Sequence, residues 1–225
     1  EMVASMAHQV RTPLSAAILY ASQLGHPAVD EKKRQLFSKK ILERLHYLER
    51  QVNDMLVFAK EGHLAMDVFS LQTLVDNVRV GLLDVISEGK IQFYAVNNCE
   101  LDRMKGNSDV LQGAIMNLVT NAVDAIKDEG RIELLVERYD AQHIIIKITD
   151  SGVGIESKNL QRIFEPFFTT RVAGTGLGLA VVDSVVKAHG GYIECTSSIG
   201  VGTEFNLMLK CIEQDFLPNL SGEEE

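Results

Sequence analysis

The chain has 225 residues, of which 46% are apolar, 24% charged and 6% aromatic, with three cysteines and no tryptophan. This composition is typical of globular proteins and excludes collagen-like, disordered and disulfide-scaffold classes. The net charge of −9 is unevenly distributed, because residues 1–68 carry +1 and residues 69–225 carry −10. Nucleic-acid binding depends on lysine and arginine neutralising phosphates, so the acidic second part argues against a nucleic-acid partner.

The cysteines and the hydropathy pattern indicate a cellular setting. Cys99, Cys195 and Cys211 are odd in number and widely spaced, so we expect reduced thiols in a cytoplasmic protein rather than a zinc site or a disulfide. No apolar run approaches the ~20 residues of a membrane span, and no charged-then-apolar leader opens the chain. We therefore expect no membrane contact by this segment. The chain starts inside a helical pattern, so we also expect a further part upstream.

Two helices are predicted at the start of the chain. Apolar residues recur every three or four positions from Val3 to Leu24, and again from Phe37 to Ala59. Gly25 and the proline that follows shortly after it end the first stripe. Because a two-helix hairpin has little core of its own, this pattern favours a four-helix bundle built by two copies of the chain, a homodimer.

The rest of the chain mixes helices and strands. The helical patterns cover residues 71–87, 108–127 and 176–189, and the strand patterns cover residues 132–136, 144–148, 192–196 and 203–209. This order predicts an α+β fold in which helices lie on one sheet. The expected domains are 1–68 and 69–215, joined by a hinge at residues 67–70, with a frayed tail at 216–225.

The first candidate site lies in the first helix. His8 falls on the outward face relative to the apolar seam through Val10 and Ala17, with Thr12 four residues later on the same side. Pro13 removes a backbone donor and predicts a bend beside His8. An exposed imidazole beside a bend is accessible to a second domain, although a lone exposed histidine is more often an ordinary surface residue.

The second candidate site is spread over the acidic part. Asn117 and Asn121 share a helix face, where amide oxygens can ligate a Mg²⁺ ion that also holds phosphate oxygens. Asp150 follows an apolar strand and precedes Gly152 and Gly154. Its carboxylate can accept an exocyclic amine such as that of adenine, while the glycines let backbone approach closely.

A glycine-rich run comes directly before the helix predicted at 176–189. Its residues are Gly174, Thr175, Gly176, Leu177 and Gly178. The bare amides and the helix N-terminus can together receive phosphate groups, and Arg171 adds a positive charge near them. Each of these signals alone is more often a plain turn or polar surface, but all of them in this order predict an ATP site.

From residue 2 to residue 211 the chain resembles the transmitter region of bacterial two-component sensor histidine kinases. Residues 8–13 resemble the phosphoacceptor box, residues 117–122 the asparagine box, residues 150–154 and 174–178 the two glycine boxes, and residues 164–168 the phenylalanine box. The resemblance implies a dimerisation and phosphotransfer domain followed by an ATP-binding α/β sandwich of the gyrase, Hsp90 and histidine kinase type. It also adds Phe164 and Thr203 to the expected nucleotide-binding residues. The sequences of residues 6–13 and 169–171 are similar to those of soluble kinases of the flagellar- and nitrogen-regulating kind.

The resemblance implies a signalling phosphorelay. His8 would be phosphorylated from Mg-ATP, and the phosphoryl group would pass to an aspartate of a response-regulator receiver domain. Thr12 would orient a water for the reverse dephosphorylation. Gln9 stands where the family usually has an acidic residue, which predicts a slower step or one that draws on another acid. Asn117 stands where related ATPases often carry a water-activating glutamate, which suits transfer to histidine rather than hydrolysis.

Two alternatives stay open at this point. The first is a hydrolysing ATPase clamp of the gyrase or chaperone kind, and the second is a non-catalytic dimeric signalling scaffold.

Overall fold

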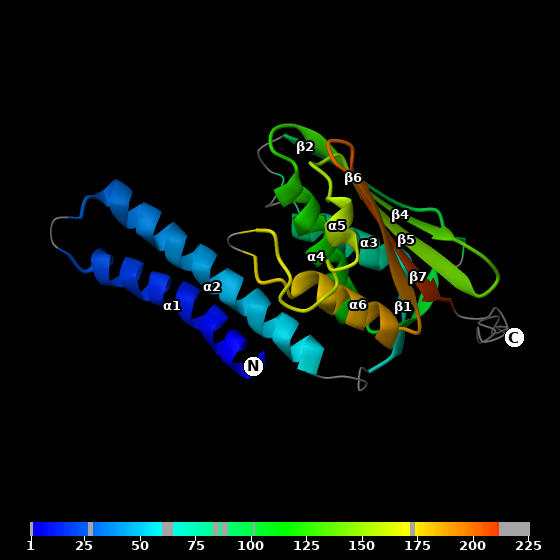
Figure 1. The fold of residues 1–225 in the computed structure, drawn as a ribbon, viewed down its shortest axis with the longest axis horizontal. Helices are drawn as coiled ribbons and strands as arrows, with labels where there is room; N and C mark the ends of the chain where they lie inside the picture. The colour runs from blue at the N-terminus through cyan, green and yellow to red at the C-terminus, as the bar shows by residue number, and fades with distance from the viewer. Residues whose placement is uncertain are drawn as a thin grey trace, which may run out of the picture.

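The computed structural model describes residues 2–26, 29–59, 65–82, 86, 90–100, 102–171 and 174–211. A helical hairpin made of α1 (Met2–Leu24) and α2 (Glu31–Ala59) extends from an α+β unit that runs from β1 to β7 (Figure 1). No helix in these ranges is long and apolar enough to cross a membrane.

Both helices of the hairpin confirm the predicted pattern. The first helix ends at Leu24, directly before Gly25, as expected. The second begins six residues before its apolar stripe, because the Asp30 carboxylate accepts a hydrogen bond from the backbone N–H of Lys33 at 2.8 Å. A side-chain acceptor of this kind at the N-cap satisfies one of the free N–H groups of the first turn.

The two helices of the hairpin pack against each other along only part of the predicted apolar stripes. Ala17 is buried, and the Tyr20 ring lies 5.8 Å from the ring of Phe37 on α2. Other large apolar side chains of the hairpin remain exposed, namely Leu14, Ile18, Leu19, Leu36, Leu42, Leu45, Val52 and Leu56. The hairpin therefore carries an apolar surface that its own two helices do not cover.

A five-stranded sheet forms the centre of the α+β unit, in the order β2-β4-β5-β7-β6. The strands are β2 (Ile91–Asn97), β4 (Gly130–Arg138), β5 (His143–Asp150), β6 (Tyr192–Ser198) and β7 (Gly202–Lys210). The β2–β4 pair is parallel, and the other neighbours are antiparallel. The four strands predicted from the sequence are confirmed, and each is two to four residues longer than predicted.

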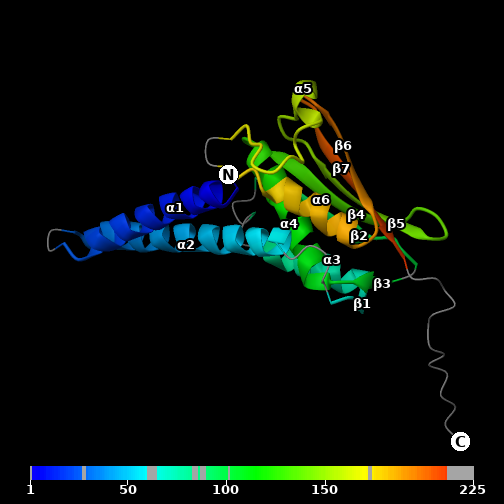
Figure 2. The ribbon, with the colours of Figure 1, turned by 60° about the horizontal axis from the view of Figure 1, so that its bottom comes forward.

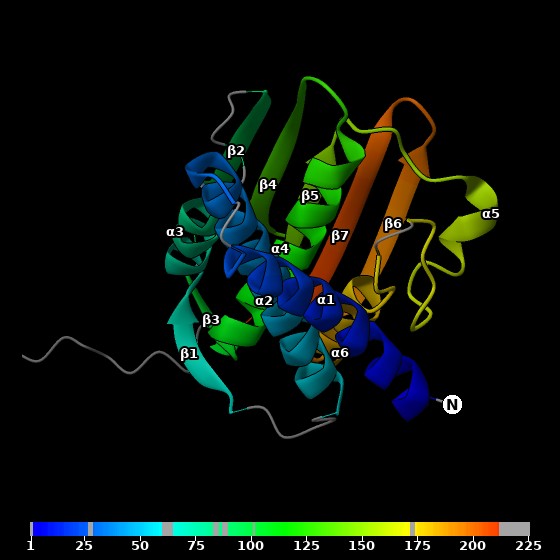
Figure 3. The same cartoon turned by 90° about the vertical axis from the view of Figure 1, so that its left-hand side faces the viewer.

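Three helices cover one face of this sheet (Figure 3). They are α3 (Leu71–Leu82), α4 (Ser108–Ala125) and α6 (Gly178–Ala188). The covered face is apolar, since Ile132, Leu134 and Val136 alternate along β4 with at most 1% exposure. This arrangement confirms the predicted fold of helices layered on one sheet. The hairpin lies on the same side, where α2 contacts α6 (Figure 2).

Three strands were missed by the sequence analysis, and one of them corrects the predicted hinge. Short β1 (Asp67–Ser70) pairs antiparallel with β3 (Arg103–Gly106) over all four of its residues. The hinge predicted at residues 67–70 is therefore wrong, because those residues belong to a paired strand. The helix predicted at residues 71–87 is described as α3 from Leu71 to Leu82, and most of the remaining predicted range lies outside the described residues.

Asp102 fastens this small sheet to the rest of the unit. Its carboxylate accepts hydrogen bonds from the Ser70 hydroxyl at 2.7 Å, the Gln72 backbone N–H at 2.6 Å and the Asn97 side-chain amide at 3.0 Å. Charge-assisted hydrogen bonds of this kind are roughly twice as strong as neutral ones. The start of α3 and the end of β2 are thus tied to one carboxylate.

A buried histidine fixes α6 against α4. The His189 Nδ1 atom lies 2.7 Å from the Val185 carbonyl oxygen, and its Nε2 atom accepts the backbone N–H of Asn107 at 3.0 Å. Asn107 is the N-cap of α4. A Cβ atom on Gly106 would lie only 2.6 Å from the His189 ring, so this approach requires glycine. The end of α6 is therefore held at the beginning of α4.

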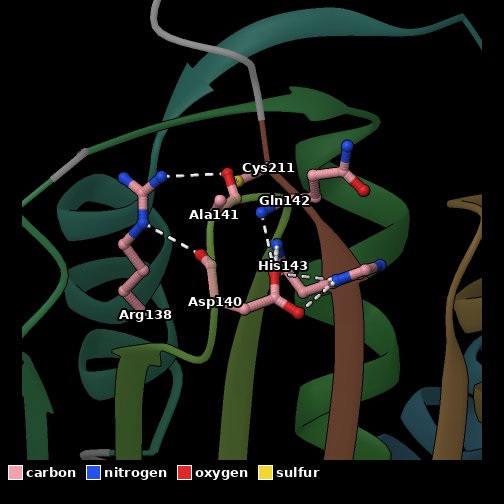
Figure 4. Close-up of polar contacts among 6 residues, drawn as sticks. All are labelled: Arg138, Asp140, Ala141, Gln142, His143 and Cys211. Atoms are coloured by element: carbon pink, nitrogen blue, oxygen red, sulfur yellow. Dashed lines mark hydrogen bonds and ion pairs between the residues drawn. The ribbon is translucent and has the colours of Figure 1, made fainter.

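The turn between β4 and β5 is closed by polar contacts (Figure 4). The Asp140 carboxylate accepts the backbone N–H groups of Gln142 and His143 and lies 2.9 Å from the His143 Nδ1 atom. The His143 side chain and these N–H groups hold the pKa of Asp140 below its ordinary value. The Cys211 backbone N–H donates to the Gln142 carbonyl, so the same turn secures the end of β7.

Candidate functional site

Asp150 is the buried polar centre of the site at the end of β5. The residue is 7% exposed, and its Oδ1 atom accepts the Gly152 backbone N–H at 2.7 Å. Burial raises the pKa of Asp150 above its ordinary value, while the N–H groups of Gly152 and Thr203 and the charge of Arg171 act in the opposite direction. The carboxylate is therefore a hydrogen-bond acceptor held in a poorly solvated position.

The two glycines after Asp150 allow close backbone approach, as the sequence predicts. A Cβ atom on Gly152 would lie 2.8 Å from the Asp150 Oδ1 atom. Gly154 has a φ of +73°, and a Cβ there would collide with the carbonyl of Ser198, the last residue of β6. Only glycine can adopt this backbone conformation so close to the Ser198 carbonyl without strain.

The floor beside Asp150 is formed by neighbouring strands. Thr203 is the direct partner of Asp150 on β7, and Ser197 is the partner of Thr203 on β6. The Thr203 and Ser197 hydroxyl oxygens are 3.0 Å apart, and Ser197 also accepts the backbone N–H of Ile155 at 2.8 Å. Ser197 was missed by the sequence analysis, because only the register of the sheet places it here.

Apolar side chains complete this part of the site. Phe164 is half-buried and meets the Phe205 ring edge-on, with ring centroids 6.4 Å apart. Burial and the nearby charge of Asp150 raise the pKa of the Cys195 thiol to about 12. A thiol with so high a pKa is protonated near neutral pH, so Cys195 contributes packing rather than reactivity.

The glycine-rich run forms the entry to α6. Gly176 has a φ of +68°, and its carbonyl accepts the backbone N–H of Phe167 at 2.8 Å. The Thr175 hydroxyl accepts the Leu177 N–H at 3.1 Å. Leu177 is the N-cap of α6 and provides no side-chain cap. Helix α6 starts at Gly178, two residues later than predicted, and presents an N-terminus that suits an anion.

Helix α4 carries the two candidate asparagines on its half-buried side. Gly178 lies against Asn117, since a Cβ on the glycine would be 3.7 Å from the Asn117 Cγ atom. The Asn121 Oδ1 atom accepts a hydrogen bond from Arg171 Nη1 at 3.2 Å, and its backbone carbonyl accepts one from Nη2 at 2.9 Å. Asp124, which the sequence analysis did not single out, lies 2.6 Å from the same guanidinium.

These segments converge on one site. Arg171 contacts Asn121 on α4, and the Val153 N–H, three residues after Asp150, donates to the carbonyl of Ala125 at the end of the same helix at 3.1 Å. The set supplies a buried acceptor for an amine, an uncapped helix N-terminus with an arginine for phosphates, and amide oxygens that suit Mg²⁺. These donors and acceptors fit a magnesium nucleotide. The Asn121 oxygen would exchange its contact with Arg171 for the metal.

The part of α1 that carries His8 is described in its backbone alone. Residues 2–24 are helical through Pro13, but the side chains of His8 and Gln9, with the predicted exposure of His8, lie outside the described residues. Thr12 is exposed, while Ala17 is buried on the predicted seam. The bend at Pro13 stays a prediction.

Two family models match the chain. The model of the His Kinase A phospho-acceptor domain matches residues 1–64. The model described as histidine kinase-, DNA gyrase B- and HSP90-like ATPase matches residues 106–212. The second match contains the whole of the site described above, from Asn117 to Thr203, and it shows that residues 106–212 of the α+β unit are a domain of this ATPase type.

Relatives align along nearly the whole chain. The sensor protein kinase FleS of Pseudomonas aeruginosa is 42% identical over 215 residues, covering 94% of this chain and 52% of FleS. The structure of histidine kinase ThkA in complex with response regulator TrrA has a TM-score of 0.70 and 25% identity over 95% of this chain and 62% of that one. Full-length ShkA in complex with AMPPNP also has a TM-score of 0.70 and 25% identity, over 94% of this chain and 46% of ShkA.

The chain thus spans about half the length of a curated relative such as FleS. The two domain models match in this order along one chain, and sensor kinases align with both. The chain belongs to the two-component sensor histidine kinases and forms a transmitter region of that family.

Proposed function

We propose that this chain is a protein-histidine kinase that, as a homodimer, transfers the γ-phosphoryl group of ATP to His8 and passes it to an aspartate of a response-regulator receiver domain. The observation that carries the proposal is the convergence of Asp150, Arg171, Asn121 and the start of α6 on one site. The complexes of ThkA with a response regulator and of ShkA with AMPPNP support the same partner and the same nucleotide class.

Asp150 would accept the exocyclic amine of adenine. Thr203, Gly152 and Gly154 would line the same pocket, and Phe164 would wall it. Because the Asp150 carboxylate is poorly solvated, a hydrogen bond to it contributes more than one made in water. This pocket supplies base recognition, while the chemistry takes place at the other end of the nucleotide.

The phosphate end would lie over α4 and α6. Residues 174–178 and the N-terminus of α6 would receive the phosphates, with Arg171 offsetting their charge. Asn121 would hold Mg²⁺, which when bound neutralises charge on the β- and γ-phosphates. Asn117 provides no carboxylate that could activate water, which favours transfer over hydrolysis.

His8 would attack in line with the leaving group. An imidazole is mostly neutral slightly above pH 7, so it can act as a nucleophile without a strong base. Gln9 would orient the ring through its amide but would leave the developing positive charge uncompensated. Thr12, one turn later, would orient a water when the kinase dephosphorylates its partner.

The reaction requires the ATP-binding unit to approach the helix that carries His8. We place the domain boundary upstream of Asp67, since β1 is paired with β3 inside the α+β unit. The movement would therefore rotate β1 together with the ATP site. A cytoplasmic location, without membrane contact by this segment, is part of the proposal.

The test is incubation with γ-labelled ATP, followed by separate acid and alkali treatment. A phosphohistidine loses its label in acid and keeps it in alkali, and the His8→Gln variant should incorporate none while still binding ATP. Acid-stable label, or label on the variant, would refute His8 as the acceptor. Steady phosphate release without a phosphoprotein would instead indicate a hydrolysing clamp, and neither activity would indicate a scaffold.

A further inference from the structure

The loop before α6 is fastened to α4 by a single side chain. Arg171 reaches across 50 positions of sequence to donate from Nη1 to the Asn121 Oδ1 atom at 3.2 Å and from Nη2 to the Asn121 carbonyl at 2.9 Å. The same Nη1 atom lies 2.6 Å from the Asp124 Oδ2 atom. Both terminal nitrogens of the guanidinium are therefore engaged by one turn of α4.

The backbone of Arg171 is fixed as well. The Thr169 hydroxyl accepts the Arg171 N–H at 3.0 Å, and the Arg171 carbonyl accepts the N–H of Gly174 at 3.2 Å. A Cβ on Gly174 would collide with the Thr169 hydroxyl, so the turn closes tightly. The loop therefore presents Arg171 toward α4 from a turn held by its own hydrogen bonds.

The three acceptors on α4 differ in their charge and in whether they would also bind Mg²⁺. The Asn121 Oδ1 atom is the proposed ligand for Mg²⁺, so its contact with Arg171 competes with metal binding. The Asp124 carboxylate and the Asn121 carbonyl carry no such task. Of these two, only Asp124 bears a charge, and charged acceptors hold a guanidinium more strongly than neutral ones.

We propose that Asp124 is a positioning residue that anchors the loop of residues 169–171 to α4 through Arg171 and so keeps the guanidinium beside the phosphate end of the nucleotide site. The inference rests on the proposed function for the role of that site, but the anchor itself is a property of the protein alone. Without Asp124, the guanidinium would keep only neutral acceptors and would have to be immobilised when the nucleotide binds, at a cost in side-chain entropy.

Asp124 could also weaken nucleotide binding, which is the alternative to the positioning role. Its carboxylate adds a negative charge near the phosphates and occupies Arg171, so its removal would strengthen nucleotide binding if charge repulsion dominated. Side chains of both partners are substantially exposed, at 40% for Arg171 and 63% for Asp124. Solvent screening weakens a through-space charge effect at such a position, so we expect the loss of positioning to prevail.

Limited trypsin digestion tests the anchor without relying on activity. Trypsin must take an arginine side chain into its own specificity pocket before it cleaves, so the contacts to α4 should slow the cut after Arg171. The isosteric Asp124→Asn variant should be cut roughly two- to fivefold faster, the range expected for one exposed ion pair. Asp124→Glu should restore slow cleavage, and Asp76→Asn, which removes the exposed ion pair with Arg79 on α3, should leave it unchanged.

Kinetics and binding test the positioning role. Asp124→Asn should raise the KM for Mg-ATP roughly two- to fivefold with a smaller change in kcat. In an Arg171→Gln background, Asp124→Asn should add nothing further, because Asp124 acts through Arg171.

Unchanged cleavage after Arg171, a lowered KM or additive effects in the double variant would each overturn the inference. Calorimetric titration with Mg-AMPPNP compares the nucleotide affinities of the same variants without phosphoryl transfer. If wild-type protein forms no phosphohistidine, the proposed function fails while the digestion and titration still decide on the anchor.

Discussion

The helical hairpin and the α+β unit differ in how completely they bury their apolar residues. In the α+β unit, one continuous core joins three helices to the inner face of the sheet, with Leu118, Ile132 and Val182 fully buried. In the described part of the hairpin, Ala17 is buried, while Ile18 and Leu19 are about 60% exposed. The comparison indicates that the α+β unit has a core of its own, whereas the hairpin leaves an apolar surface that its own two helices do not cover.

The largest effect that would separate the α+β unit from the hairpin is expected on removing the carboxylate of Asp150. Hydrogen bonds to charged groups contribute about 1.5–3 kcal/mol, so Asp150→Asn should weaken Mg-ATP binding roughly 10- to 100-fold while self-association of the hairpin stays unchanged. Calorimetric titration and sedimentation measure the two properties. Unchanged ATP affinity would remove Asp150 from the base pocket.

The same variant has a predicted effect on stability. The pKa of Asp150 is raised above its ordinary value of 3.8, so the native state binds more protons than the unfolded state in the window above 3.8. The free energy of unfolding therefore falls as pH rises through that window. At neutral pH the buried charge destabilises the fold, and Asp150→Asn should raise Tm. A lowered Tm would contradict this account of the burial.

A charged residue on the hairpin should have the converse effect. Ile18→Glu places a carboxylate on the exposed apolar surface, where burial of one such side chain contributes about 1.5–3 kcal/mol. Self-association should weaken at least roughly tenfold in sedimentation equilibrium, with ATP affinity unchanged. The matched control is Val80→Glu, which changes an equally exposed apolar residue on α3. Equal effects of the two variants would argue against a hairpin interface.

A smaller effect is expected from the turn that leads into α6. Gly176 has positive φ, and a Cβ there would press against the backbone of Phe167. Gly176→Ala should cost about 1–3 kcal/mol of unfolding free energy and should also weaken ATP binding. As a control, a Cβ on Gly113 in α4 meets nothing within 4 Å, so Gly113→Ala should be neutral or stabilising in urea denaturation.

The smallest change concerns the residue after the phosphoacceptor. Gln9→Glu supplies a carboxylate that compensates the positive charge developing on the imidazole. Autophosphorylation should therefore accelerate, by less than the roughly 10²-fold at the lower end of general acid–base assistance. Single-turnover labelling measures the rate. An unchanged or lower rate would show that the amide of Gln9 is adequate.

Much of the fold was predictable because its signals are local. The apolar stripes of α1 and α2 and the strands β4 to β7 follow from periodicities within single segments. The short strands β1 and β3 were missed because each has only four residues, too few to show a periodic signal. The parallel strand β2 was missed for a related reason, since Ala95 is its only buried residue.

The candidate site divides in the same way. Sequence order alone singled out Asp150, Asn121, the glycine run and His8, because each belongs to a short motif whose residue types define a chemistry. Only the tertiary structure decided that Ser197 supports Thr203, that His189 fixes α4 against α6, and that Asp124 holds Arg171. These contacts join residues brought together by sheet register and helix packing, and local patterns in the chain do not encode such distant pairings.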